Sequence, residues 1–195
     1  RHGRILGEEQ FRATFGQRNQ EIVQMLFGAD QDDAVVRTLS DEKEALFRAT
    51  VGSQASPLPG VVPLLSALQC AGYVQAIGSS APLRNIEMLL SAVGVRHLFQ
   101  AIVAEEDVRA GKPDPEIFLL AAERLGVAPG RCLVIEDAVA GVAAAKAAGM
   151  ACLAVTNTRD RQALSAADRV VGSLAEVNAA TIARLMQPGC ALGAG

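Results

Sequence analysis

The sequence predicts an α/β fold with a Rossmann-like parallel sheet, and two patterns support this prediction. After Gly60, short apolar runs alternate with segments of helical periodicity, which is typical of successive β-α-β units. Before Ser56, helical patterns occur without a convincing strand, which indicates a small helical unit ahead of the sheet. The two parts meet at Ser56–Gly60, where two prolines and a glycine interrupt regular structure.

Residues 1–56 are expected to form this helical unit, with three helices. Glu8–Ala13 predicts a short first helix, and Arg18–Phe27 predicts a second because its apolar residues share one face. Asp32–Val51 predicts a third helix, whose many charged residues indicate a solvated surface rather than a site. The apolar stripe expected on this third helix consists of Val35, Val36, Leu39, Leu46 and Phe47.

Residues 57–187 are expected to form the core, in which strands and helices alternate. The expected strands are Tyr73–Gly78, Ala101–Ala104, Cys132–Ile135, Ala151–Val155 and Arg169–Val171. The expected helices are Val61–Ala71, Leu83–Val93, Pro115–Leu125, Val139–Ala148 and Leu174–Met186. This alternation implies a parallel sheet with right-handed crossovers. Residues 188–195 are expected to form a flexible tail.

The composition is that of a soluble enzyme domain. The chain has 195 residues, of which 50% are hydrophobic, and a formal net charge of −3, which argues against a general nucleic-acid binder. It contains no apolar stretch of membrane-spanning length and no visible signal peptide, so we expect a cytoplasmic protein without a membrane partner. The four cysteines lack metal-ligand spacing, which indicates reduced thiols. They are Cys70, Cys132, Cys152 and Cys190.

Glu136 and Asp137 form an adjacent pair of carboxylates at the end of the apolar run Cys132–Ile135. Two such groups are costly to bury unless a positive charge lies between them. The carboxyl ends of strands are also where open α/β sheets bind ligands. We therefore expect a site for a divalent cation here, Mg²⁺ held by oxygen ligands. The alternative is that Asp137 merely caps the helix that follows.

Two further polar loops follow expected strands at the same edge of the sheet. Ser79 and Ser80 stand at a strand–helix junction, where hydroxyl and N–H groups suit an anionic oxygen, although serines there also act as simple caps. Lys112 lies in Gly111–Pro115, whose two prolines stiffen the backbone. An ammonium held in place neutralises a phosphate or a developing negative charge, and the alternative is an exposed loop lysine. Three such loops at one edge favour a single site.

Together these segments resemble a known family. Ile77–Ser80, Gly111–Pro115 and Val134–Gly141 are similar to the second, third and fourth motifs of the haloacid dehalogenase-like hydrolase superfamily in residues, order and spacing. The nearest group contains phosphoglycolate phosphatase and β-phosphoglucomutase, whose helical cap precedes these motifs, so residues 1–56 resemble an incomplete cap. Phe15–Asn19 resembles the substrate-facing turn of such caps. The resemblance covers nearly the whole chain.

The resemblance implies roles for individual residues. Ser79 would bind the transferring phosphoryl group, and Lys112 would stabilise its negative charge. Asp137 would coordinate Mg²⁺ directly, with Glu136 beside it in the metal site. The residues expected to bind or select the substrate are Arg18, Asn19, Lys43 and Ser80.

The sequence departs from the family's pattern in one respect. The family's chemistry begins with an Asp-x-Asp motif on the first core strand, which supplies a nucleophile and then a general acid/base. The printed chain has no good replacement, because Asp30 and Asp32 have the spacing but no strand before them. The absent strand is expected between those that end near Ser79 and at Ile135, whose edges would be unpaired. The 195-residue form is therefore expected to be a truncated, poorly folded and inactive portion of a longer chain.

The function that the resemblance implies is Mg²⁺-dependent removal of phosphate from a small metabolite through an aspartyl-phosphate. A sugar-phosphate mutase is the nearest alternative, and a non-catalytic phosphate- or metal-binding protein is another. Carbon–halogen hydrolysis needs no metal, and Glu136 beside Asp137 argues against it because two uncompensated carboxylates would repel an anionic substrate. The expected assembly is a monomer or homodimer.

Overall fold

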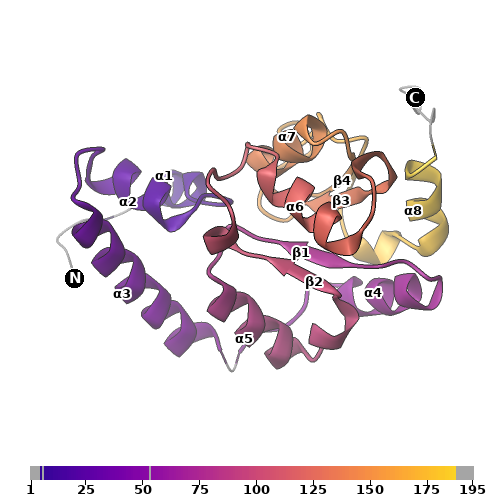
Figure 1. The fold of residues 1–195 in the computed structure, drawn as a ribbon, viewed down its shortest axis with the longest axis horizontal. Coiled ribbons are helices and arrows are strands. Elements are labelled where there is room, and N and C mark those ends of the chain that lie inside the picture. The colour runs from indigo at the N-terminus through magenta and orange to yellow at the C-terminus, as the bar shows by residue number, and fades with distance from the viewer. Residues whose placement is uncertain (1–4, 6, 53, 188–195) are drawn as a thin grey trace.

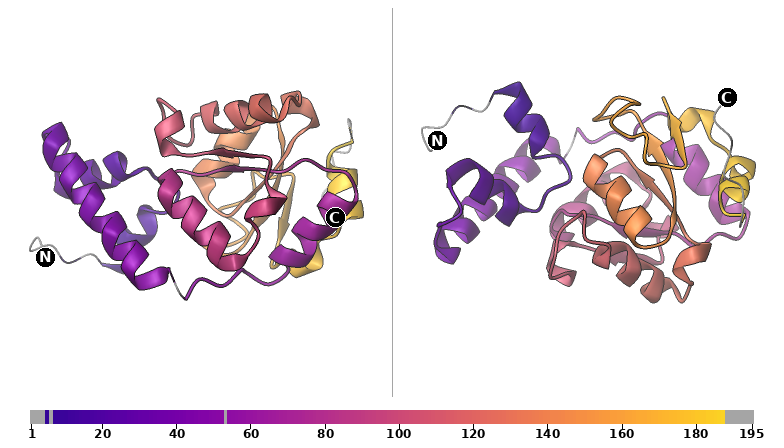
Figure 2. Two further views of the ribbon diagram at one scale, coloured as in Figure 1. Left: turned by 60° about the horizontal axis from the view of Figure 1, so that its bottom comes forward. Right: turned by 90° about the horizontal axis from the view of Figure 1, so that it is seen from above.

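The computed structural model describes residues 5, 7–52 and 54–187 of the chain. The expected tail at 188–195, with Cys190, lies outside these residues. Three helices lie at one end of the molecule, beside an α/β core whose strands run through the centre between layers of helices (Figures 1 and 2). This arrangement matches the α/β class with parallel strands that the sequence predicts.

The helical unit begins close to where the sequence predicts it. Its helices are α1 (Glu8–Ala13), α2 (Asn19–Phe27) and α3 (Asp33–Val51). Asp32 precedes α3 as its N-cap, and its Oδ1 accepts a hydrogen bond of 2.8 Å from the Ala34 N–H. The expected apolar stripe on α3 is wrong at two positions, because Val35 is 42% exposed and Leu46 is 46% exposed. Among the described residues α3 packs mainly against α2 and α5, which cover only part of its circumference.

The core contains five short parallel strands in two separate sheets. One sheet has the order β1-β2 and the other has the order β3-β4-β5. The strands are β1 (Ala76–Gly78), β2 (Ala101–Val103), β3 (Leu133–Glu136), β4 (Ala151–Val155) and β5 (Arg169–Val171). The first strand is shorter than predicted, because the N–H of Gln75 donates to the side chain of Gln100 at 2.7 Å instead of to a neighbouring strand.

Helices cover both faces of these sheets. On β4, Cys152 and Ala154 pack in the cluster formed with α6 and α7, whereas Leu153 and Val155 pack in the cluster formed with α4 and α8. Such alternation is what the two-residue period of a strand requires when both faces are buried. The helices of the core are α4 (Val61–Cys70), α5 (Leu83–Val93), α6 (Glu116–Leu125), α7 (Val139–Ala147) and α8 (Ala179–Leu185).

The last predicted helix, Leu174–Met186, is two elements in the structure. A short 3₁₀ helix, η4, spans Leu174–Glu176, and α8 starts anew at Ala179. Asn178 causes the restart, because its Oδ1 accepts a hydrogen bond of 2.9 Å from the Thr181 N–H. Asparagine is a strong N-cap and marks a helix start, so the continuous helix was a wrong prediction. Further 3₁₀ turns are η1 (Arg96–Leu98), η2 (Glu105–Asp107) and η3 (Pro129–Arg131).

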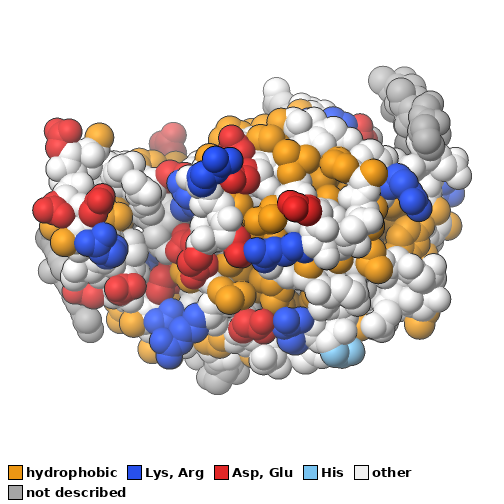
Figure 3. All heavy atoms as spheres, viewed as in Figure 1, with side chains coloured by type: hydrophobic (Ala, Val, Ile, Leu, Met, Phe, Trp, Pro, Cys, Tyr) orange, Lys and Arg blue, Asp and Glu red, His pale blue; other side chains and the backbone are white. Residues whose placement is uncertain are grey.

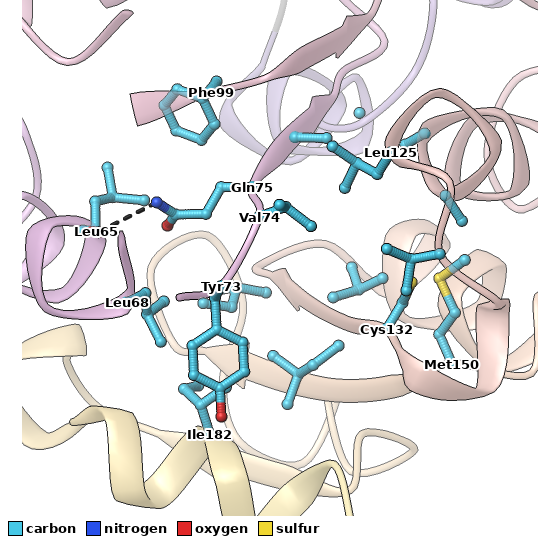
Figure 4. Close-up of a pocket in the computed structure, with 18 of the residues that line it drawn as sticks. Leu65, Leu68, Tyr73, Val74, Gln75, Phe99, Leu125, Cys132, Met150 and Ile182 are labelled. Atoms are coloured by element: carbon cyan, nitrogen blue, oxygen red, sulfur yellow. Dashed lines mark hydrogen bonds between the residues drawn. The ribbon is translucent and has the colours of Figure 1, made fainter. Parts of the chain in front are cut away.

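A cavity of about 710 Å³ separates the two sheets. Tyr73, Val74 and Gln75 lie on the side of β1, and Cys132 and Met150 lie across from them (Figure 4). Within the described residues β1 and β3 are each the edge of their sheet on the side that faces this cavity, and no pairing joins them. The opening therefore lies between the two strands where the sequence predicts unpaired edges.

On the face seen in Figure 3, acidic and basic side chains are interspersed over the helical unit and the adjoining part of the core, and hydrophobic side chains show over the rest of the core. Mixed charge of this kind gives no extended field of one sign on that face. Within the described part of the chain, no helix combines the length and the apolar character that crossing a bilayer requires.

Candidate functional site

A cavity of about 860 Å³ lies where the carboxyl ends of β1 and β3 meet the helical unit. Three loops predicted to carry function contribute to its wall, one after each of β1, β2 and β3. Because parallel strands end at the same edge, residues far apart in sequence come together there. The predicted site residues that line it are Ser79, Ser80, Lys112, Glu136, Asp137, Asn19 and Lys43.

The two serines after β1 differ in their bonding. The backbone N–H of Ser79 donates to Val103 O at 3.0 Å, and its Oγ accepts from the Ala81 N–H at 3.2 Å. The Ser80 Oγ is buried and has no hydrogen-bond partner among the described residues. A buried hydroxyl without a partner is unfavourable unless a ligand satisfies it. The Ser80 hydroxyl therefore fits a bound anionic oxygen.

Lys112 is buried rather than exposed in its loop, with only 7% of its surface accessible. Its Nζ forms an ion pair with Glu136 Oε1 and donates to Gly78 O at 3.3 Å. The same nitrogen lies 4.7 Å from the centroid of the Phe118 ring, a cation–π distance. These contacts hold the ammonium at the cavity wall. The alternative interpretation, an exposed loop lysine, does not agree with this burial.

Glu136 is held through both carboxylate oxygens. Oε1 pairs with Lys112, and Oε2 accepts hydrogen bonds from the N–H groups of Asp137 at 2.9 Å and Ala138 at 3.0 Å. These N–H groups lie just ahead of α7, where a negative charge is favoured. The structure therefore places Glu136 as the counter-ion of Lys112.

Asp137 is oriented by the loop that follows β4. Its Oδ2 accepts a hydrogen bond of 2.9 Å from Asn157 Nδ2, and its backbone carbonyl accepts one of 2.6 Å from Thr158 Oγ1. A carboxylate fixed in this way presents its oxygens to the cavity in a defined direction. The alternative interpretation was that Asp137 caps α7. Among the described residues the N-cap of α7 is instead Ala138, and it makes no side-chain bond to the helix start.

The described residues fit a magnesium site with few protein ligands. Among them, no group of three or more His, Cys, Asp or Glu side chains is clustered for metal binding. Mg²⁺ commonly takes one or two carboxylates and completes its shell with water and substrate phosphate. Asp137 meets this requirement as a hard oxygen donor at the cavity wall, whereas both oxygens of Glu136 are already bonded.

The predicted substrate residues of the helical unit mostly contact protein. Asn19 donates from its N–H and its Nδ2 to the Glu105 carboxylate at 3.4 and 3.1 Å. Arg18 does not line the cavity, and its Nη1 donates to Val108 O at 3.4 Å and to Arg109 O at 3.2 Å. Burial raises the pKa of Glu105 above its usual value, against the opposing effect of the bonds from Asn19. These contacts fasten α2 to the core.

Lys43 borders the cavity from α3, where its ammonium is paired with the adjacent Glu44. Glu44 is buried at 6% exposure and also accepts a hydrogen bond from Asn85 of α5. Asn85 in turn accepts one of 2.8 Å from Arg48 Nη1. The result is a polar network that joins α3 to the core behind the cavity.

Sequence reasoning missed several residues of the site. Asn157 and Thr158 follow β4 at the same sheet edge as the three loops that were found, so the same rule applied to that strand identifies them. Glu44 and Asn85 had no comparable signal, because each lies on a helix and their contact depends on how two helices meet.

Comparisons with known proteins identify the family of this chain. A family model described as haloacid dehalogenase-like hydrolase matches residues 1–149. The chloroplastic 5-amino-6-(5-phospho-D-ribitylamino)uracil phosphatase of Arabidopsis thaliana is 31% identical over 174 residues, which cover 89% of this chain and 47% of that protein. The fructose-1-phosphate phosphatase YqaB of Escherichia coli (strain K12) is 36% identical over 138 residues, or 71% of this chain and 72% of that protein. The chain thus spans about half the length of the Arabidopsis protein.

Solved structures share the fold. The β-phosphoglucomutase of Clostridium difficile superimposes with a TM-score of 0.86 at 23% identity, over 94% of this chain and 83% of the other. CbbY of Rhodobacter sphaeroides, solved in complex with phosphate, gives a TM-score of 0.79 at 25% identity, over 93% of this chain and 85% of the other. Since the family model covers well over half of the residues and the fold is shared, this chain belongs to the haloacid dehalogenase-like hydrolase family.

Proposed function

We propose that the protein is a Mg²⁺-dependent hydrolase that removes phosphate from a small phosphorylated metabolite. The observation that carries the proposal is the meeting of Ser80, Lys112 and Asp137 at one cavity, from the loops after three different strands. An unpartnered hydroxyl, a buried ammonium and an oriented carboxylate are the groups that a phosphate with a bound cation requires. Curated relatives with phosphatase names support this choice over the mutase alternative.

Each residue has a distinct task in this proposal. The Ser79 and Ser80 loop binds phosphate oxygens, and the Lys112 ammonium neutralises charge that develops on the phosphoryl group. Glu136 keeps the ammonium in place through their ion pair. Asp137 binds Mg²⁺, which supplies positive charge that favours attack on the phosphorus.

Asn19 and Lys43 border the cavity from the helical unit and contribute to substrate selection, while Arg18 acts indirectly by holding α2.

The nucleophile belongs in the opening between the two sheets. A strand inserted parallel to β1 and β3 would pair with both edges, and its carboxyl end would reach the cavity between Ser79 and Asp137. An aspartate at that end would attack the phosphorus and form an aspartyl-phosphate as the ester P–O bond breaks, and the alcohol would leave with a proton. Water would then hydrolyse the aspartyl-phosphate, which releases inorganic phosphate and restores the carboxylate.

The first experiment measures phosphate release from p-nitrophenyl phosphate by the protein expressed from its complete reading frame. We expect turnover with Mg²⁺, a loss of at least about 100-fold with EDTA, and recovery when Mg²⁺ is restored. Asp137→Asn should remove activity, whereas Asp160→Asn, an acidic residue on the loop that follows β4, should leave it intact. Phosphate release that EDTA does not reduce would contradict the Mg²⁺ dependence, and phosphate binding without any turnover would support a non-catalytic protein.

A second experiment concerns the opening between the sheets. The 195-residue chain alone is expected to be inactive, because within its described residues no strand lies between β1 and β3 to carry a nucleophile. If this chain released phosphate as fast as the product of the complete reading frame, the placement of the nucleophile would be wrong.

A further inference from the structure

Strand register places the loop after β4 beside the loop after β3. Glu136 of β3 pairs with Ala154 of β4, so the residues just beyond each of them are neighbours. β4 is almost wholly buried, and the Thr156 N–H donates to Val171 O at 3.0 Å on the next strand. The loop therefore starts from a rigid base.

Asn157 and Thr158 both bond to Asp137, and they hold different parts of it. The Asn157 amide donates to the carboxylate at 2.9 Å, and the Thr158 hydroxyl donates to the backbone carbonyl at 2.6 Å. One bond fixes the direction of the side chain and the other fixes the backbone that carries it. Both donors are neutral, so they orient the carboxylate without cancelling its charge.

The position of Asn157 argues for a role beyond bracing the loop. Its side chain is exposed and lines the same cavity as Asp137. A hydrogen bond between exposed groups contributes little to folding, because water replaces it readily. A donor to a metal-binding carboxylate, in contrast, changes the affinity for the metal strongly, since it selects the orientation from which the oxygen binds.

We propose that Asn157 and Thr158 are positioning residues for the magnesium site. The inference rests on the proposed function in one respect, namely that Asp137 binds Mg²⁺. Asn157 and Thr158 do not touch the metal. They act through Asp137 by holding its carboxylate in the direction that the cation requires.

The test measures Mn²⁺ binding directly, by the electron paramagnetic resonance signal of the free ion, in the protein from the complete reading frame. We expect Asn157→Ala and Thr158→Val each to raise the Kd for Mn²⁺ by about tenfold, in line with other residues that orient metal ligands. Thr158→Ser keeps the hydroxyl and should bind as the unaltered protein does. Asn178→Ala is the matched control, because this asparagine caps α8 instead, so its loss should lower the Tm and leave Mn²⁺ binding unchanged.

Kinetic measurements on the same variants separate positioning from structural damage. The Mg²⁺ concentration for half-maximal phosphate release should rise with the Kd for Mn²⁺, while kcat at saturating Mg²⁺ should recover most of its value. Failure of the unaltered protein to bind Mn²⁺ would contradict the proposed function. If the unaltered protein and Asn157→Ala bind Mn²⁺ equally well, the positioning role is overturned and the proposed function still stands. This conclusion holds whatever result Thr158→Val gives.

Discussion

Gly141 lies against the carboxylate of Glu136, so closely that a Cβ on residue 141 would sit 2.1 Å from the carboxyl carbon. The carboxylate has little freedom to move away, because its oxygens are bonded to Lys112 and to the N–H groups that precede α7. The lack of a side chain at residue 141 is therefore what allows Glu136 to reach the ammonium of Lys112.

Gly141→Ala is expected to lower the free energy of unfolding by about 1–3 kcal/mol, the usual cost of overpacking. Alanine has the higher helix propensity by about 1 kcal/mol, so a loss of stability here reports the clash with Glu136. Displacement of Lys112 should also lower kcat/KM, by about tenfold or more. Chemical denaturation measures the free energy of unfolding, and phosphate release measures kcat/KM. Gly130→Ala is the control, since a Cβ there meets no atom within 4 Å and should change neither quantity.

Lys112→Met should destabilise the protein by about 3–5 kcal/mol, because it leaves the buried Glu136 carboxylate unpaired. The double variant Lys112→Met/Glu136→Gln removes both charges and should regain much of the lost stability, as followed by denaturant unfolding. It should remain inactive, because the ammonium is gone. A double variant as unstable as the single one would show that the ion pair does not explain the loss.

Ser80→Ala should separate stability from ligand binding. The hydroxyl is buried without a partner among the described residues, so its removal should leave the free energy of unfolding unchanged or raise it by up to about 1 kcal/mol. The Kd for inorganic phosphate, measured by calorimetry, should rise about two- to tenfold through the lost hydrogen bond. Ser173→Ala is the contrasting variant, since that Oγ caps η4 through the Ala175 N–H at 3.2 Å. It should destabilise the protein without affecting phosphate.

Glu105 should make stability depend on pH. Burial raises its pKa from the ordinary value of 4.5, so the folded state holds the proton more tightly than the unfolded state does. The stabilising contribution is therefore complete below about pH 4.5 and is lost as the pH rises through the higher folded-state pKa. Glu105→Gln should flatten this part of the curve of Tm against pH. Glu116, whose pKa is lowered mainly by bonds from the Ala110 and Arg109 N–H groups, is the control, and Glu116→Gln should change the slope in the opposite sense.

The described cysteines should differ in reactivity. Burial raises the pKa of Cys152 to about 12, so almost no thiolate exists at pH 8. Cys70 is exposed and should be alkylated by iodoacetamide under the same conditions. Peptide mass spectrometry before and after unfolding measures the difference. Rapid labelling of Cys152 in the folded protein would contradict its burial in the core.

Most of the fold could be predicted from the sequence, because local patterns determine it. The helix Leu83–Val93 and the strands Ala151–Val155 and Arg169–Val171 have the predicted bounds. The errors arose where a single polar contact overrides periodicity. Asn178 starts a new helix inside a continuous apolar pattern, and the neighbours of Gln75 end the first strand early.

The sequence predicts which residues belong to the candidate site better than it predicts which of them bond to one another. The rule that functional loops follow parallel strands found Ser80, Lys112 and Asp137, and the structure places all three at one cavity. Their roles stay predictions. Glu136 was expected in the metal site beside Asp137, but in the structure it pairs with Lys112. This pairing depends on side-chain geometry between distant segments, which neither spacing nor composition determines.

The reach of Lys112 across the molecule has a thermodynamic consequence. Its nitrogen bonds to the Gly78 carbonyl on one sheet and to Glu136 on the other, so it bridges two bodies that share no backbone pairing among the described strands. A segment entering the opening would fix the separation of those bodies, and an anion held by both would favour the same separation. Strand insertion and anion affinity are then linked, and each must strengthen the other by an equal factor.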